Sequence, residues 1–99
     1  SMTSRTTAEQ KTTTKSLYLP KKKADKPLRE CVRQAVDVYF AHMNGHPTDG
    51  LYKLLISEVE KPLLESVMKH TGSNQVRAAQ ILGINRTTLR SKLKKYDIL

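Results

Sequence analysis

The stretch SNQVRAAQILGINRTTLRSKLKKYDIL, residues 73–99, decides the fold of the C-terminal part of this 99-residue chain. Its first apolar run ends at Gly83, and glycine most readily adopts the left-handed backbone that closes a helix. Asn85 has the short amide side chain that suits the N-cap of a following helix. The pattern predicts two short helices joined by a tight turn, which is the helix-turn-helix signature.

The second predicted helix has one apolar face and one basic face. At about 100° per residue, Leu89, Leu93 and Tyr96 fall on one stripe. Because the start of this helix meets base edges in the major groove in helix-turn-helix proteins, the other face is predicted to bind DNA. An ordinary helical hairpin with a solvated charged face is the alternative. The residues on the face opposite the apolar stripe are Thr87, Ser91, Lys94 and Lys95, with Arg90 beside them.

The net charge of +9 is concentrated at the two ends of the chain. Residues 1–26 carry a net +5, residues 27–72 a net −1 and residues 73–99 a net +5. A basic composition that served only solubility would not show this division. Neutralisation of phosphates with release of counterions explains why a basic end binds DNA, with an affinity that falls as salt rises.

Other classes of function have no supporting residues in the sequence. Cys31 has no base nearby in the sequence, which a nucleophilic thiol requires, so we predict no enzyme and no cofactor. Gly45 and Pro47 break the helix that would align two of the three histidines, so we predict no metal site. Since there is no apolar run of about 20 residues and no leader, we expect a cytoplasmic protein without membrane contact.

Residues 1–24 are predicted to form a flexible basic arm, because they offer little to bury. Within the arm, Leu17, Tyr18 and Leu19 favour a weak strand. A disordered tail that places Lys21–Lys23 near phosphates is the alternative.

A first long helix is predicted to start at Asp25–Pro27, since proline is tolerated in a first helical turn. Asn44 and Gly45 are expected to end it. Its apolar positions recur at helical spacing and form one strong face, which comprises Leu28, Val32, Ala35, Val36, Tyr39, Phe40 and Met43.

A second long helix is predicted from about Gly50 to His70, with Thr48 and Asp49 as caps and a kink at Pro62. It carries too many apolar residues for one stripe, and a helix that is apolar on most sides must be buried on most sides. We therefore predict a dimer with an intertwined core, and a monomer with exposed Leu and Ile side chains is the alternative.

The predicted fold is all-α, with four helices and an N-terminal segment that is mobile or a weak β-hairpin. Residues 25–72 are expected to hold the dimerisation helices, and residues 73–99 the helix-turn-helix. The end of the long helix is expected to pack against the helix-turn-helix.

The order of these motifs resembles the Fis family of bacterial nucleoid-associated proteins. The resemblance covers residues 26–99 and rests on KPLRECVRQAV, YFAHMNG, LYKLLISEVEKPLLESVM, SNQVRAA and GINRTTLRSKLKKY. It implies a homodimer in the bacterial nucleoid that bends double-stranded DNA at degenerate pseudo-palindromic sites. It also implies regulation of transcription and site-specific recombination, with RNA polymerase or a DNA invertase as partners.

The resemblance assigns base contacts to Asn85 and Arg86, and arginine suits guanine O6 and N7. Contacts with the DNA backbone would set register and affinity. The full predicted DNA-binding set is Asn74, Gln75, Asn85, Arg86, Thr87, Thr88, Arg90, Lys92, Lys94 and Lys95.

The sequence departs from the family at several positions. Val76, Thr87 and Ser91 stand where Thr, Gly and Lys are common, which predicts altered affinity. The turn at Thr71–Asn74 lacks the family's Arg, so contact with polymerase is in doubt. The N-terminal segment is expected to match the family's hairpin arm poorly. A protein-interaction accessory factor, such as a recombinase enhancer or co-regulator scaffold acting through that arm, is the alternative function.

Overall fold

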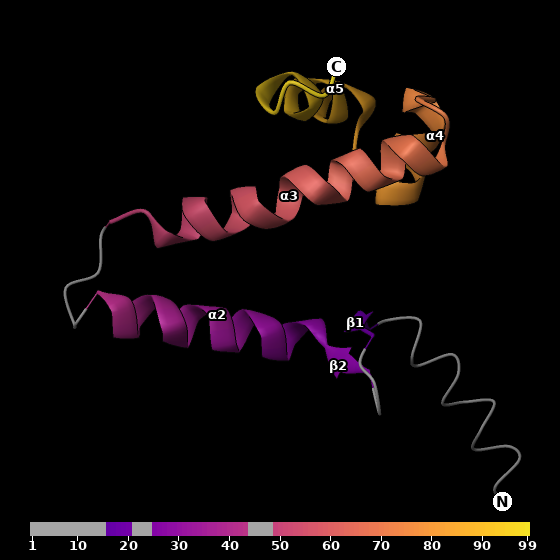
Figure 1. The fold of residues 1–99 in the computed structure, drawn as a ribbon. Helices are drawn as coiled ribbons and strands as arrows, with labels where there is room; N and C mark the ends of the chain where they lie inside the picture. The colour runs from indigo at the N-terminus through magenta and orange to yellow at the C-terminus, as the bar shows by residue number, and fades with distance from the viewer. Residues whose placement is uncertain (1–15, 21–24, 44–48) are drawn as a thin grey trace, which may run out of the picture. The chain divides into compact units, whose positions relative to one another are not determined.

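The computed structural model describes residues 16–20, 25–43 and 49–99. The chain divides into two compact units, Ser1–Thr48 and Asp49–Leu99. The all-α class is confirmed for the described residues, with a small sheet near the N-terminus (Figure 1). None of the described helices is both long enough and apolar enough to cross a membrane. The elements are β1 (Tyr18–Leu19), β2 (Lys26–Pro27), α2 (Leu28–His42), α3 (Leu51–His70), α4 (Gln75–Leu82) and α5 (Arg86–Lys95).

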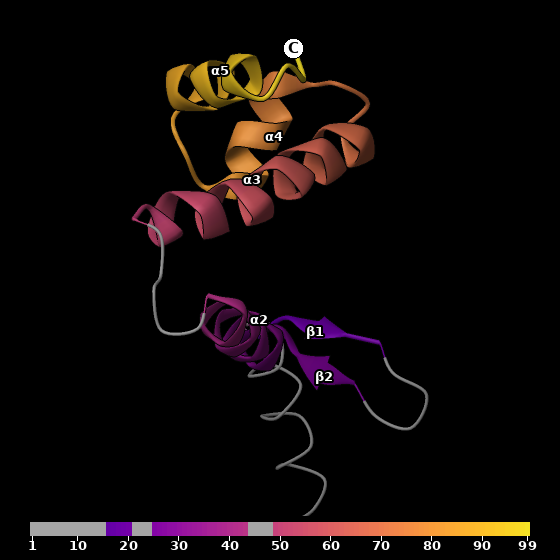
Figure 2. The ribbon, with the colours of Figure 1, turned by 60° about the vertical axis from the view of Figure 1, so that its left-hand side comes forward.

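The first unit contains an antiparallel pair of two-residue strands, β1 and β2 (Figure 2). The register places Tyr18 opposite Pro27 and Leu19 opposite Lys26. This is the weak hairpin, one of the two alternatives that the sequence left open. The predicted contacts of Lys21–Lys23 and the arm before residue 16 lie outside the described residues.

α2 begins at Leu28, so the predicted helix start at Asp25–Pro27 was wrong. Pro27 has φ −62° and ψ 140°, which is extended backbone, and the residue before a proline is also held extended. The Leu28 N–H then donates to the Leu17 carbonyl over 2.9 Å. Lys26 and Pro27 therefore form a strand.

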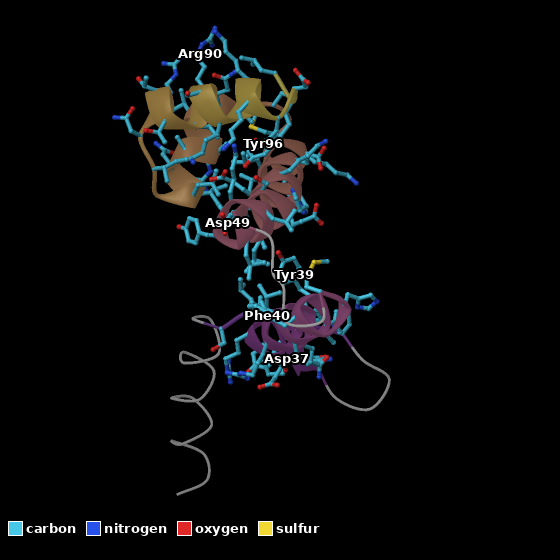
Figure 3. All side chains as sticks on the ribbon, turned by 90° about the vertical axis from the view of Figure 1, so that its left-hand side faces the viewer. Asp37, Tyr39, Phe40, Asp49, Arg90 and Tyr96 are labelled. Atoms are coloured by element: carbon cyan, nitrogen blue, oxygen red, sulfur yellow. The ribbon has the colours of Figure 1, made fainter. Side chains whose placement is uncertain are left out.

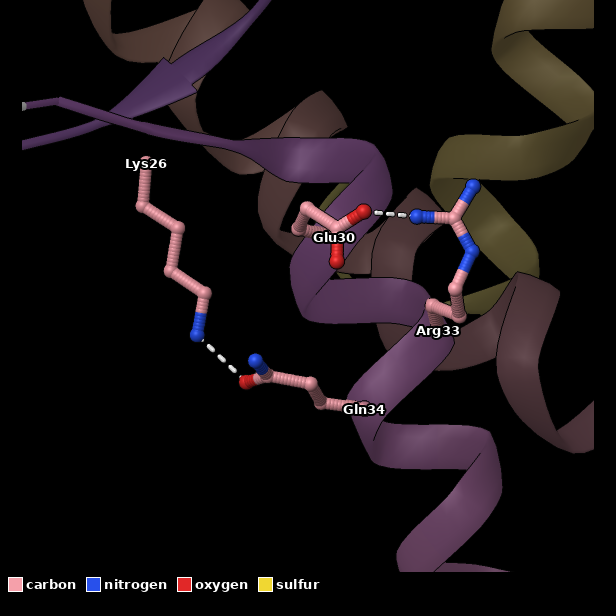
Figure 4. Close-up of polar contacts among 4 residues, drawn as sticks. All are labelled: Lys26, Glu30, Arg33 and Gln34. Atoms are coloured by element: carbon pink, nitrogen blue, oxygen red, sulfur yellow. Dashed lines mark hydrogen bonds and ion pairs between the residues drawn. The ribbon is translucent and has the colours of Figure 1, made fainter.

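Two polar contacts hold the first turns of α2 (Figure 4). Glu30, in the first turn, forms an ion pair with Arg33 one turn later. The Lys26 ammonium, on the strand, donates to the Gln34 side chain. An acidic side chain in a first turn also interacts favourably with the helix dipole.

The apolar face of α2 is only partly covered within the described chain, because no residue of this helix is fully buried. The rings of Tyr39 and Phe40 meet edge to face with their centroids 5.5 Å apart. α2 ends at His42, and the predicted stop at Asn44 and Gly45 lies outside the described residues. Of the predicted core positions, Ala35 and Phe40 are exposed, and Leu28, Val32, Val36, Tyr39 and Met43 are half-buried.

α3 spans Leu51–His70 and continues through Pro62, so the predicted extent is confirmed to within one residue. Its N-cap position is Gly50, which has a left-handed φ of 95° and provides no side-chain cap. The predicted capping by Asp49 was therefore wrong, and Thr48 lies outside the described residues.

The second unit has a small core between α3, α4 and α5. Leu64 of α3 is buried against both shorter helices, so the predicted packing of the long helix on the helix-turn-helix is confirmed. The buried residues are Leu64, Ala78, Ala79, Leu89 and Leu93, and Val67, Met68, Leu82, Ile84, Tyr96 and Ile98 pack around them.

α3, α4 and α5 end in the same way. After each helix a left-handed residue reverses the chain, and the next N–H returns to a carbonyl in the last turn, as in a Schellman motif. The left-handed residues are Gly72 (φ 61°), Gly83 (φ 71°) and Asp97 (φ 58°), and the returning bonds run from Ser73 to Met68 (2.9 Å), Ile84 to Ala79 (3.1 Å) and Ile98 to Leu93 (2.9 Å).

Candidate nucleic-acid interface

α4 starts at a capped N-terminus. The Arg77 N–H donates to Asn74 Oδ1 over 3.0 Å, which satisfies one of the free donors of the first turn. Asn74 is exposed and Gln75, the first residue of α4, is half-buried. Both predicted contact residues therefore lie at the N-terminal end of this helix.

Gly83, Ile84 and Asn85 connect α4 to α5. Gly83 has the predicted left-handed backbone, with φ 71°. Asn85 Oδ1 accepts the Thr87 N–H over 2.7 Å, so the predicted N-cap of α5 is confirmed. The half-buried side chain of Ile84 packs at the edge of the core and anchors the turn there.

Small residues allow the two helices to cross closely. Ala78 is 0% exposed and Ala79 is 6% exposed, and both belong to the core that contains Leu89 and Leu93 of α5. A larger side chain at Ala78 would force α5 outward, because close-packed interiors leave no room for added methylene groups.

The two faces of α5 are divided as the sequence predicted. Leu89 and Leu93 are buried, and Tyr96 is half-buried on the same side. Figure 3 shows Arg90 projecting from the outer side of α5, whereas Tyr96 lies on the side toward α3. The exposed residues on α5 and its cap are Asn85, Arg86, Thr87, Thr88, Arg90, Ser91, Lys94 and Lys95.

Lys92 differs from the other basic residues of α5. Its Nζ lies 2.7 Å from Glu60 Oε2, on α3, and its side chain is 34% exposed. The other carboxylate oxygen, Oε1, accepts the Tyr96 hydroxyl over 2.6 Å. Lys92 is therefore paired within the chain, whereas Arg86, Arg90 and Lys94 have no acidic partner among the described residues.

The ion pair between Lys92 and Glu60 shifts the pKa of both side chains. The hydrogen bond from Lys92, followed by that from Tyr96, lowers the pKa of Glu60. The hydrogen bond to Glu60 raises the pKa of Lys92. Both shifts favour the charged forms, so the pair is ionised at neutral pH.

Sequence reasoning missed Glu60. A signal was present, because Glu60, Leu64 and Val67 have helical spacing and share one side of α3. An acid on the side of a helix that packs against a basic helix is a candidate partner for a lysine.

Among the residues that the structure describes, no group of three or more potential ligands could hold a metal ion.

A short helix, a glycine-containing turn and a second helix with an outward basic face define a helix-turn-helix protein. The profile described as "Bacterial regulatory protein, Fis family" matches residues 55–96. The profile described as "DNA-binding protein Fis N-terminal domain" matches residues 2–48.

Several curated relatives carry the name DNA-binding protein Fis. The protein from Proteus mirabilis is 59% identical over 73 residues, which are 74% of each chain. The protein from Escherichia coli O1:K1 / APEC is 58% identical over the same share. The protein from Psychromonas ingrahamii is 52% identical over 91 residues, which are 92% of each chain.

The chain belongs to the Fis family. The N-terminal family profile begins at residue 2, whereas the alignment with the Proteus mirabilis protein covers 73 residues, so the expected poor match of the N-terminal arm stays a prediction. The resemblance read from the sequence began at residue 26 because its recognisable motifs lie on the helices, whereas the hairpin strands are only two residues long.

We predict that the ion pair of Glu60 makes stability depend on pH in the acid range. A group whose folded pKa is lowered stabilises the fold above its unfolded pKa, about 4.3 for glutamate, and that contribution is lost as pH falls further. Urea unfolding at fixed protein concentration should show a larger loss between about pH 5 and pH 3 for the unmodified chain than for Glu60→Gln. Glu58→Gln, at an exposed position on the same helix, should behave like the unmodified chain. Parallel curves for all three proteins would contradict the role of the pair.

Proposed function

We propose that this protein is a homodimeric DNA-binding and DNA-bending regulator of the bacterial nucleoid. The observation that carries the proposal is the division of α5, with Leu89 and Leu93 buried and Arg86, Arg90 and Lys94 exposed. The names of the relatives, DNA-binding protein Fis, support DNA as the ligand. Regulation of transcription, and of site-specific recombination where an invertase is present, is part of the proposal.

Base reading is assigned to the start of α5. Arg86 is its first residue and is exposed, so its guanidinium is free to donate to guanine O6 and N7 in the major groove. Asn85 uses its Oδ1 to cap the helix, which leaves its amide N–H groups to donate to a base or a phosphate. The N-cap bond also fixes the direction in which α5 leaves the turn.

Backbone contacts are assigned to both helices. Asn74 and Gln75 open α4, where free N–H groups favour an anion. The long side chains of α5 supply positive charge along its exposed face. The proposed backbone-contact residues are Asn74, Gln75, Thr87, Thr88, Arg90, Lys94 and Lys95.

The dimer is proposed from the apolar surface that the single chain leaves exposed. Tyr52, Ile56, Val59 and Leu63 of α3 have helical spacing, and their exposed fractions are 80%, 38%, 41% and 47%. On the helical wheel this stripe is separate from Leu64, which faces the core. Burying a side chain of this size contributes about 1.5–3 kcal/mol, so burial of the stripe by a second copy would stabilise a dimer.

A symmetric dimer would present two α5 helices to one duplex. DNA that must bend to meet both is selected by its deformability as well as by direct contacts. A partner protein such as RNA polymerase or an invertase is proposed for the N-terminal hairpin, whose Leu17, Tyr18 and Leu19 are exposed. That activity is separable from DNA binding, because the hairpin and α5 belong to different compact units.

We predict that Arg86→Ala and Lys94→Ala weaken DNA binding in different ways. Arg86→Ala should cost about 1–3 kcal/mol at a specific site and relax the base preference there. Lys94→Ala should weaken binding to all duplexes alike and reduce the salt slope by about 1 per contact. Titrations over a salt series measure both effects, with Lys53→Ala on α3 as a control. Unchanged binding by an Arg86→Ala, Arg90→Ala double variant would refute the proposal.

We predict that the chain is a dimer in solution. Light scattering at micromolar concentration should give about twice the 11.2 kDa mass of one chain. The double variant Val59→Glu, Leu63→Glu should shift the mass to that of one chain, because it places charges in the proposed interface. Ile81→Glu, at another exposed apolar position on α4, should remain dimeric. A one-chain mass for the unmodified protein would reject the dimer.

A further inference from the structure

Glu60 makes two contacts at the C-terminal end of α5, one with Lys92 in the last turn and one with Tyr96, the C-cap residue. Its Oε2 is paired with Lys92 at 2.7 Å, and its Oε1 accepts the Tyr96 hydroxyl at 2.6 Å. Its side chain is only 17% exposed. Both oxygens of one carboxylate on α3 thus contact α5 or its C-cap residue.

Lys92 lies on a different side of α5 from Arg86, Arg90 and Lys94, which belong to the exposed basic face. At about 100° per residue, Arg86, Arg90 and Lys94 fall on one flank of the Leu89–Leu93 stripe, and Lys92 falls on the other. That second flank faces α3, where Glu60 lies. The Lys95 ammonium lies 5.3 Å from the centre of the Tyr96 ring.

A paired lysine contributes less to DNA binding than a free one. For Lys92 to neutralise a phosphate, its ammonium must leave Glu60, and the carboxylate then remains uncompensated beside the phosphate backbone. The salt slope is proportional to the number of phosphates that the protein neutralises. An ion pair within the protein has no net charge and therefore adds little to that slope.

We propose that Glu60 is a positioning residue that withholds the charge of Lys92 from DNA and fixes the side of α5 turned toward the duplex. This inference rests on the proposed DNA binding. It revises the sequence prediction for Lys92, which was placed among the residues that contact the DNA backbone. The charge of the interface is then set by Arg86, Arg90, Lys94 and Lys95.

The ion pair between Glu60 and Lys92 is present throughout the neutral pH range. The contact with Lys92 lowers the pKa of Glu60, so the carboxylate stays ionised throughout the neutral range. The charged groups that face it are Lys92 and, at longer range, Lys95. Release of Lys92 from Glu60 therefore requires a substitution such as Glu60→Gln, and a change of pH within the physiological range does not cause it.

The test is the salt dependence of binding to a random-sequence duplex by full-length variants. Glu60→Gln keeps the size of the side chain and a group that can accept the Tyr96 hydroxyl, but it removes the charge that holds Lys92. The log–log salt slope should steepen by about 0.9 per subunit in contact, which adds a further fall in affinity of about 3.5-fold per subunit between 50 and 200 mM salt.

Lys92→Ala should then reduce the slope more in the Glu60→Gln background than in the unmodified chain. Glu58→Gln is the matched control, because it removes the same charge from an exposed position on α3. A general effect of net charge would give both glutamine variants the same slope. Equal slopes for Glu60→Gln and the unmodified chain, or equal effects of Lys92→Ala in both backgrounds, would overturn the inference.

A second measurement needs no substitution and therefore does not depend on a variant folding. Lysine acetylation of the unmodified protein, read by mass spectrometry, should show Lys92 reacting slowly both with and without duplex DNA. Lys94 should react quickly in the free protein and be protected by DNA. A fast Lys92 that becomes protected by DNA would contradict the inference. Failure of the unmodified protein to bind any duplex would instead refute the proposed function, so the two failures are distinguishable.

Discussion

Close packing of α4 against α5 is the constraint on which the rest of the second unit depends. Only five residues are buried there, and two of them are alanines, Ala78 and Ala79. Their small side chains let Leu89 and Leu93 reach Leu64 of α3 and fill the core from the other helix. Because so few groups are buried, each one contributes a large share of the stability, and deletion of a buried leucine side chain costs about 2–5 kcal/mol.

The same packing determines where the charge of α5 lies. Once Leu89 and Leu93 are fixed inward, the helical repeat places Arg86, Arg90 and Lys94 outside. Backbone geometry at the two ends of α5 reinforces this orientation, since Asn85 caps its start and Asp97 reverses the chain after its end. Glu60 adds polar contacts on one flank. α5 is therefore held by apolar burial and by one carboxylate that contacts both Lys92 and Tyr96. The function proposed for the basic face follows from this fixed orientation.

Local chemistry allowed much of this region to be predicted from the sequence. The left-handed Gly83, the cap at Asn85 and the apolar stripe of α5 depend on residues within a few positions of one another, and each was confirmed. The predictions that were wrong depend on contacts with residues distant in the sequence, or on which of two neighbouring residues takes the N-cap position. Pro27 belongs to a strand because β1 lies upstream to pair with it, and Gly50 takes the N-cap position that was assigned to Asp49. Glu60 and Lys92 are 32 positions apart, so only the packing of α3 on α5 brings them together. The DNA contacts themselves remain predictions.

The core holds α5 in the orientation that we propose lets Arg86 enter the major groove. Methylation of guanine N7 by dimethyl sulfate reports on this placement of Arg86, because that atom lies on the major-groove edge. On a duplex bound by the unmodified protein, we expect two groups of protected guanines related by two-fold symmetry. The guanine read by Arg86 should regain its reactivity in each group when Arg86→Ala is bound at saturation. Binding that leaves every guanine N7 reactive would show that Arg86 does not enter the major groove.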